Sequence, residues 1–159
     1  TIEIISTMPI LEREIVIGKY LAGLALIILG LVTTLIHYVT LISVGSSIDH
    51  GAVFAGYLGL ALLGGVYTAV SLFASSVTDN QVIAFIVGIA IVLVFFMLDK
   101  LLFFVPPSLS GIIQYLGTDF HLSNMSRGVI DTRNLVYFGS VIGFFLALTV
   151  RILESRKWN

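Results

Sequence analysis

The fold is decided by TIEIISTMPILEREIVIGK, residues 1–19, and by the run that follows it, YLAGLALIILGLVTTLIHYVTLISV, residues 20–44. The first stretch carries five charged side chains and is broken by Pro9. The second carries no Asp, Glu, Lys or Arg and exceeds the roughly 20 residues that a helix needs to cross a bilayer. We therefore expect the charged segment to lie at a water boundary and the apolar run to enter lipid.

The composition of the whole chain supports a membrane protein. Of the 159 residues, 58% are hydrophobic and 11% are charged, and the mean hydropathy is +1.09. Soluble domains carry about 25% charged residues, so this chain cannot cover a globule with polar surface. The net charge of −1 gives no reason to expect nucleic acid as a partner. The absence of cysteine excludes disulfides and thiolate metal sites.

Charged residues divide the sequence into four apolar runs. We expect membrane spans near residues 20–44, 54–77, 82–98 and 135–152. Backbone polar groups in lipid must be satisfied internally, and the runs lack the alternation of a barrel strand, so the spans are expected to be helices. The prediction is an all-α membrane protein with a single transmembrane domain, residues 1–159, and a cytoplasmic amphipathic segment at residues 1–14.

The connections between spans differ in character. Residues 45–51 form a short polar loop, and residues 78–81 form a tight turn in which Thr78 or Asp79 is expected to cap the next helix. At the end of the third span, we expect Lys100 to reach the outer interface with its long side chain, or, as an alternative, to form a gating pair with Asp99.

The outer segment, residues 99–134, is expected to hold two short interfacial helices. The first follows Pro106–Pro107, with Ser108 as its N-cap and Gly117 as its stop. The second runs from Asp119 to Arg127 and is ended by Gly128. Asp131 is expected to cap the last span.

The distribution of basic residues predicts the orientation. The side with both termini has five Lys and Arg residues, and the other side has three. The first group comprises Arg13, Lys19, Arg151, Arg156 and Lys157; the second comprises Lys100, Arg127 and Arg133. The positive-inside rule therefore places both termini in the cytoplasm.

The chain shows no motif of a catalytic or nucleotide-binding site. Gly18–Lys19 is not a P-loop, because Arg13 stands where the first glycine is required and Tyr20 replaces the Ser or Thr. A nucleophile elbow and a zinc-protease motif are also absent. We expect a protein that is not itself an enzyme and has neither a cofactor nor a metal.

The three histidines allow only weak hypotheses. His37 shares a helical face with Thr33 in the first span, and polar residues inside a membrane often mark a substrate path. A hydrogen bond to a neighbouring helix, or a place at the interface, is the favoured explanation of His37. A metal site at His50 and His121 is conceivable, but solvated loop residues are the favoured interpretation.

Small residues recur at helical spacing in two spans, which favours close helix packing inside the chain or in a dimer. One stripe comprises Ala61, Gly65 and Ala69, and the other comprises Gly139, Gly143 and Ala147. Thr68, Ser71 and Ser75 are expected to add a polar edge to the second span.

Several segments together resemble ABC-2 type transporter permeases. EIISTMPI (residues 3–10) and EIVIGKYL (14–21) resemble the family's cytoplasmic segment, and YLGL (57–60) with LFASSVTDNQ (72–81) is similar to its next helix and turn. SRGVIDTRNLVYF (126–138) and LTVRILESRKW (148–158) most resemble the gliding-motility-associated branch. Leu11 departs from the family, which has a polar capping residue there.

The resemblance implies a permease subunit in the plasma membrane that pairs with a separate cytoplasmic ATPase and with a second permease subunit. ATP and Mg²⁺ would bind to the ATPase. The family has six spans, so this chain resembles the C-terminal two-thirds of a subunit. The residues expected to couple the ATPase to the membrane are Glu3, Pro9, Glu12, Arg13 and Glu14.

Two other functions remain open at this point. One is a membrane-embedded enzyme that uses His37 and neighbouring hydroxyls, and the other is a structural component of an envelope or motility complex. Co-purification of an ATPase would favour the transporter over both.

Overall fold

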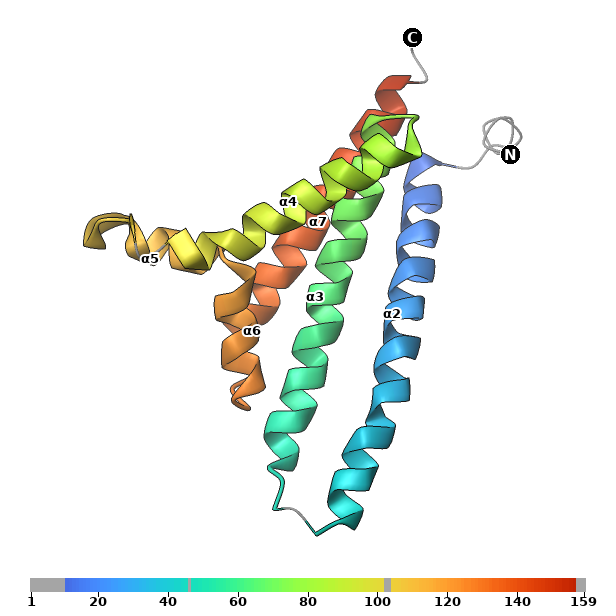
Figure 1. Ribbon diagram of the computed structural model, residues 1–159. Helices are drawn as coiled ribbons and strands as arrows, with labels where there is room; N and C mark the ends of the chain where they lie inside the picture. The colour runs from blue at the N-terminus through green and yellow to red at the C-terminus, as the bar shows by residue number, and fades with distance from the viewer. Residues whose placement is uncertain (1–10, 46, 102–103, 157–159) are drawn as a thin grey trace.

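The computed structural model describes residues 11–45, 47–101 and 104–156, and every regular element in these ranges is a helix (Figure 1). The helices are α2 (Glu12–Ser43), α3 (His50–Val77), α4 (Gln81–Leu101), α5 (Pro107–Leu116), α6 (Thr118–Ser126) and α7 (Thr132–Arg156). Four of them, α2, α3, α4 and α7, are long and apolar enough to cross a membrane. The prediction of an all-α protein with four spans is confirmed.

Helix α2 is longer than the span predicted for it. It begins at Glu12 and contains 32 residues, which correspond to about 48 Å at 1.5 Å per residue. The hydrocarbon core of a bilayer is only about 30 Å thick. Residues 12–14 therefore form the first turn of the spanning helix itself and not a separate segment, because no proline or helix stop lies between Glu12 and Tyr20. Residues 1–10 lie outside the described part.

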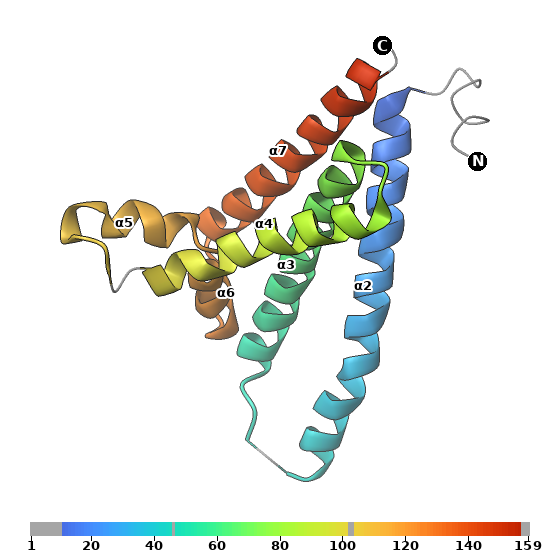
Figure 2. The same ribbon diagram turned by 45° about the horizontal axis from the view of Figure 1, so that its top comes forward.

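Helix α3 is the centre of the bundle and packs against α2, α4, α6 and α7 (Figures 1 and 2). Glycines allow α2 to approach it closely. A Cβ atom added to Gly64 would lie 2.7 Å from Ile27 Cγ2, and one added to Gly23 would lie 2.7 Å from Thr68 Cγ2. These distances are shorter than a carbon–carbon contact, so a larger residue at either glycine would push α2 and α3 apart.

The buried core lies between α3, α6 and α7. Phe138 and Met125 are completely buried, and Phe145 stacks edge-on against Phe73 and Phe95. Most other large apolar side chains point outward: Leu26 is 70% and Phe54 69% exposed. Such exposure fits helices whose outer faces are solvated by lipid.

The turn between α3 and α4 corrects one prediction. Asn80, and neither Thr78 nor Asp79, caps α4, because its Oδ1 accepts hydrogen bonds from the backbone N–H groups of Val82 and Ile83 at 2.9 and 3.4 Å. The Thr78 hydroxyl instead accepts from the N–H of Asn80 at 3.2 Å. The two residues before Asn80 thus shape the turn, and Asn80 satisfies the free donors of the helix.

The first short helix of the outer segment starts earlier than predicted. Pro107 is the first residue of α5, because a proline has a helical φ and needs no backbone donor at that position. Ser108 therefore lies inside the first turn and is not the N-cap. The helix ends at Gly117, as expected.

The second short helix does not lie flat on the surface. Helix α6 runs along α3: Leu122 and Met125 meet Gly59, and Gly128 meets Ala52. Gly128 adopts φ +84°, a conformation that favours glycine and ends the helix as predicted. Asp131 then caps α7 through the N–H of Arg133 at 2.9 Å, which confirms its predicted role.

The molecule has two distinct ends. Helix α2 begins and α7 ends at one of them, which also holds the α3–α4 turn; we call it the terminal end (Figure 1, top). The loop between α2 and α3 marks the opposite one, the loop end. Helix α4 slants away from the bundle and carries α5 to one side (Figures 1 and 2).

Candidate functional site

The predicted coupling residues that the structure describes lie at the terminal end, on the first turn of α2. The charged side chains of the terminal end come from the first turn of α2, from the α3–α4 turn and from the last turns of α7. Of the five predicted coupling residues, Glu3 and Pro9 lie outside the described residues. Glu12, Arg13 and Glu14 stand on the first turn of α2.

Glu14 has a local structural role. Its Oε2 accepts a hydrogen bond from the backbone N–H of Leu11 at 3.3 Å, and its own N–H donates to the Leu11 carbonyl at 2.9 Å. This arrangement satisfies a backbone donor at the start of α2, where Leu11 has no polar side chain to cap the helix. Glu12 and Glu14 also place negative charge at the positive end of the helix dipole. Arg13 is exposed.

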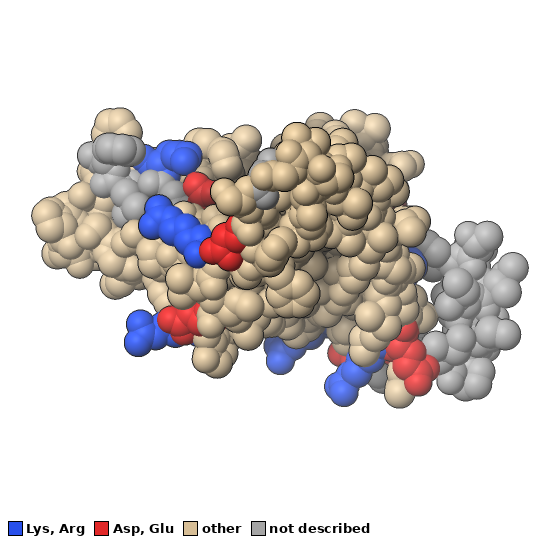
Figure 3. Space-filling model, turned by 90° about the horizontal axis from the view of Figure 1, so that it is seen from below, with Lys and Arg blue, Asp and Glu red and all other residues tan. Residues whose placement is uncertain are grey.

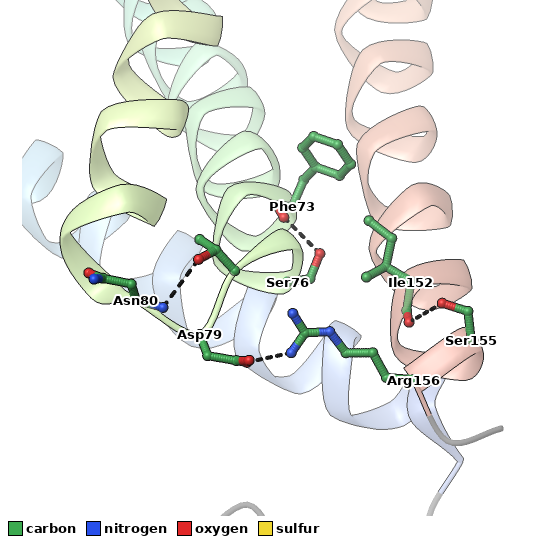
Figure 4. Close-up of polar contacts among 8 residues, drawn as sticks. Phe73, Ser76, Asp79, Asn80, Ile152, Ser155 and Arg156 are labelled. Carbon is green, nitrogen blue, oxygen red and sulfur yellow. Dashed lines mark hydrogen bonds and ion pairs between the residues drawn. The ribbon is translucent and has the colours of Figure 1, made fainter. Parts of the chain in front are cut away.

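An ion pair at the terminal end was not predicted. Arg156, in the last turn of α7, donates from Nη1 to Asp79 Oδ1 in the α3–α4 turn (Figure 4). The pair joins residues 77 positions apart, so no local sequence pattern could reveal it. The Asp79 side chain is 90% exposed, and an exposed pair of this kind contributes at most about 1 kcal/mol. The pair matters for the arrangement of the helices, because it holds the α3–α4 turn against α7.

The first predicted stripe of small residues lies inside the bundle. Ala69 is fully buried, and a Cβ atom added to Gly65 would meet the Tyr20 hydroxyl at 2.8 Å and Ile142 at 3.1 Å. Gly65 thus lies where α2, α3 and α7 come together. Ala61 is half-buried beside α2. Three further glycines, which were not among the predicted packing residues, are equally close to their neighbours: Gly23, Gly59 and Gly64.

The second predicted stripe faces outward. Nothing in the described residues lies within 4 Å of a Cβ atom added to Gly139 or Gly143, and Ala147 is exposed. This stripe does not pack inside the described chain. Its role in a dimer remains a prediction.

The predicted substrate-path residues do not share a cavity. The Thr33 hydroxyl donates to the carbonyls of its own helix at Gly30 and Leu29. His37 is exposed, and its ring makes no hydrogen bond within the part of the chain that the structure describes. A substrate path at these two residues stays a prediction.

The other two histidines occupy contrasting places. His50 is exposed at the start of α3, where its Nδ1 lies 2.5 Å from the Tyr38 hydroxyl of α2. His121, expected to be a solvated loop residue, is instead completely buried in α6. Among residues 11–45, 47–101 and 104–156, no three possible metal ligands of the His and carboxylate type come together.

His121 joins three helices through polar and aromatic contacts. Its Nδ1 lies 2.8 Å from Asn134 Oδ1 on α7, and its Nε2 lies 2.9 Å from the Tyr115 carbonyl on α5. The ring stacks on Tyr137 with centroids 4.0 Å apart, and the Tyr137 hydroxyl donates to the Leu116 carbonyl. These contacts fix α5 and α6 against α7.

Lys100 is held by a residue that the sequence did not pair with it. Its Nζ lies 3.4 Å from Asp119 Oδ2 on α6 and 5.7 Å from the centre of the Phe96 ring. Neither alternative foreseen for it includes this contact, which links the end of α4 to α6.

Two grooves run between neighbouring spans. The first, of about 320 Å³, lies between α2 and α3 near the loop end and is almost entirely apolar. The second, of about 490 Å³, lies between α3 and α4 nearer the terminal end and includes hydroxyl groups. Neither is lined by His37 or Thr33.

Charge is sparse where the molecule is viewed from the loop end. In Figure 3, basic and acidic side chains lie beside one another at the left and along the lower edge of an otherwise uncharged surface.

A comparison with known families decides what this bundle is. The family model described as ABC-2 family transporter protein matches residues 1–151. The chain belongs to the ABC-2 transporter family. No curated protein and no solved structure matches it. Membership of the ABC-2 family identifies an integral membrane protein of transport, in agreement with the four spans.

Proposed function

We propose that the chain is the membrane-spanning permease subunit of a transporter driven by ATP hydrolysis in a separate ATPase subunit. The observation that carries this proposal is the match to the ABC-2 family over residues 1–151. The sequence contains no P-loop, so energy for transport must come from a partner. In this proposal, ATP and Mg²⁺ bind to the partner and not to this chain.

The first turn of α2 is the proposed contact with the ATPase. Its charged residues belong to the same continuous helix that spans the membrane. A displacement of Glu12, Arg13 or Glu14 would therefore be transmitted directly to the span. Glu3 and Pro9 would extend this contact, with Pro9 fixing the bend before the helix.

The proposed assembly lies in the plasma membrane with the terminal end in the cytoplasm. Support comes from the excess of Lys and Arg at that end. A second permease subunit would complete the transporter, and the outward stripe formed by Gly139, Gly143 and Ala147 is suited to pack against it.

The resemblance of residues 126–138 and 148–158 favours the gliding-motility-associated branch of the family. In that case the intact subunit would have six spans, two of them before residue 1. Sequencing of the full reading frame and its neighbouring genes tests this assignment, because two upstream spans and an adjacent ATPase gene are expected.

Charge substitutions on α2 test the coupling contact. In the complete transporter, Arg13→Glu and Glu14→Lys are expected to reduce co-purification of the ATPase and transport-coupled ATP hydrolysis by about tenfold, the effect of losing a charge-assisted contact of roughly 1.5 kcal/mol.

The matched control is Glu14→Gln, which keeps an oxygen that accepts from the Leu11 N–H but removes the charge. If Glu14→Lys and Arg13→Glu leave both co-purification and coupled hydrolysis intact, the first turn of α2 is not the coupling contact. If Glu14→Ala lowers only the yield of protein and Glu14→Gln does not, the role of Glu14 is to cap the helix and nothing more.

A further inference from the structure

The groove between α3 and α4 has a polar wall made by one helix. Tyr67, Ser71 and Ser75 stand four residues apart on α3, so their hydroxyls follow a single stripe along it. Gln81, at the start of α4, continues the polar wall toward the terminal end. Ser71 and Ser75 are exposed, and Tyr67 is half-buried.

These hydroxyls differ from most of the others in the chain. Thr68, Ser76, Thr149 and Ser140 each donate to a carbonyl three or four residues earlier in their own helix. Within the described residues, no hydrogen bond reaches the hydroxyls of Tyr67, Ser71 or Ser75. Thr68, predicted to share their edge, points to α2 instead.

Unpaired hydroxyls are costly where no water reaches them. A polar group that leaves water without a hydrogen-bond partner loses several kcal/mol in hydrocarbon. A stripe of three such groups on a spanning helix therefore favours an occupant that offers hydrogen-bonding atoms in a row.

The opposite wall of the groove is apolar. Phe85, Ile89, Leu93 and Phe96 line it from α4. Among the residues that the structure describes, no Asp, Glu, Lys or Arg lines the groove. Asp119 acts electrostatically on Tyr67, but it is paired with Lys100 at 3.4 Å. A charged ligand would find no opposite charge to compensate for its desolvation.

We propose that the α3–α4 groove binds an uncharged amphipathic molecule whose hydroxyl, ester or amide groups bond to Ser71, Ser75 and Tyr67 while its hydrocarbon part lies against α4. The volume of about 490 Å³ falls within the range of small-molecule sites. This inference rests on the proposed transport function, because it names the class of molecule that the permease would take up.

The test uses a diacylglycerol with a photoreactive group in one acyl chain. This probe is uncharged and presents a hydroxyl and two ester carbonyls beside a hydrocarbon chain. The full-length protein in lipid nanodiscs is irradiated, and labelled peptides are mapped. Labelling is expected in α3 and α4 at the groove, with competition by unlabelled monoacylglycerol but not by hexadecane, which has no hydrogen-bonding group.

Two variants test how far the hydroxyl groups and the open volume of the groove contribute to binding of the probe. Ser71→Ala combined with Ser75→Ala removes both hydroxyls without filling the groove, and the apparent affinity should fall about tenfold, as expected for two hydrogen bonds. Ala84→Phe fills the groove and should abolish labelling with both hydroxyls present. Ser140→Ala is the control, because its exposed hydroxyl bonds only to its own helix.

The inference is overturned if hexadecane competes as well as monoacylglycerol, or if the double alanine variant binds like the wild type. It is also overturned if an anionic phosphatidic acid probe labels the groove more strongly. Crosslinks between Ser71 or Ser75 and a second protein chain would also overturn it, because they would show that the groove packs against a helix of that chain.

Binding in nanodiscs needs no ATPase, so this experiment separates the two proposals. Binding at the groove without ATP-coupled transport would support the site and contradict the proposed function. Transport that is unaffected by both groove variants would contradict the site alone.

Discussion

His121 shows how a single residue can have a different role from the one its sequence position suggests. A histidine between Phe120 and Leu122, close to Asp119, has the pattern of a loop or a metal site. In the structure it is buried and faces two oxygen acceptors, one on Asn134 and one on the Tyr115 backbone. A ring that carries a proton on Nε2 donates to the Tyr115 carbonyl, and an Asn134 amide turned by 180° would then donate from Nδ2 to Nδ1. Asn134 Nδ2 otherwise has no partner among the described residues.

Replacement of His121 tests this role. We expect His121→Ala to destabilise the protein by about 3 kcal/mol, because it removes buried ring contacts, leaves a cavity and strands the Asn134 side chain. Thermal unfolding in detergent would show a clearly lower midpoint. His50→Ala is the control, since His50 is exposed and its replacement should cost under about 1 kcal/mol. Equal midpoints for the two variants would contradict a structural role for His121.

At the scale of helices, the contact between α2 and α3 depends on glycines, which have no side chain. Gly64 and Gly23 each lie against a branched side chain of the opposite helix. Such close approach is typical of membrane helices, which gain association energy from packing because lipid removes the hydrophobic driving force. The contact positions α2 against the centre of the bundle.

Gly64→Ala is the prediction at this scale. The new Cβ atom would lie 2.7 Å from Ile27 Cγ2, so α2 and α3 must separate, at a cost of about 1–3 kcal/mol. Because the chain has no cysteine, a pair of introduced spin labels on α2 and α3 can report the separation as an increased distance.

Gly30→Ala provides the comparison on α2. Nothing lies within 4 Å of its added Cβ atom, so the label distance should stay unchanged. Alanine is also the better helix former by about 1 kcal/mol, which should preserve or raise stability. Identical distances in Gly64→Ala and the wild type would show that glycine is not needed at this contact.

At the scale of the whole molecule, the distribution of apolar surface defines a membrane protein with one well-packed side. Helix α3 contacts every other spanning helix, whereas much of α2 and α4 remains exposed. Large apolar side chains make up most of these exposed faces, so lipid or another membrane helix must cover them. The charged residues at the terminal end then mark one of the two water boundaries.

Cysteine labelling tests the proposed orientation. In the cysteine-free chain, Ser47→Cys places a thiol in the exposed loop between α2 and α3, and Ser155→Cys places one at the exposed end of α7. On intact cells, a membrane-impermeant reagent should label position 47 and spare position 155 until the membrane is permeabilised. The opposite order of labelling would place the terminal end outside.

The sequence alone determined the fold class and the spans, because transfer of an apolar helix into lipid depends on composition and length. It also determined the caps at Gly117, Gly128 and Asp131, which act within a few residues of the chain. The tertiary structure decided which residues meet across long separations: Arg156 with Asp79, Lys100 with Asp119, and His121 with Asn134. It also decided that Ser71 and Ser75 share a groove from which Thr68 is turned away. These contacts depend on how the helices are rotated and tilted against one another, and side-chain packing between helices sets that geometry.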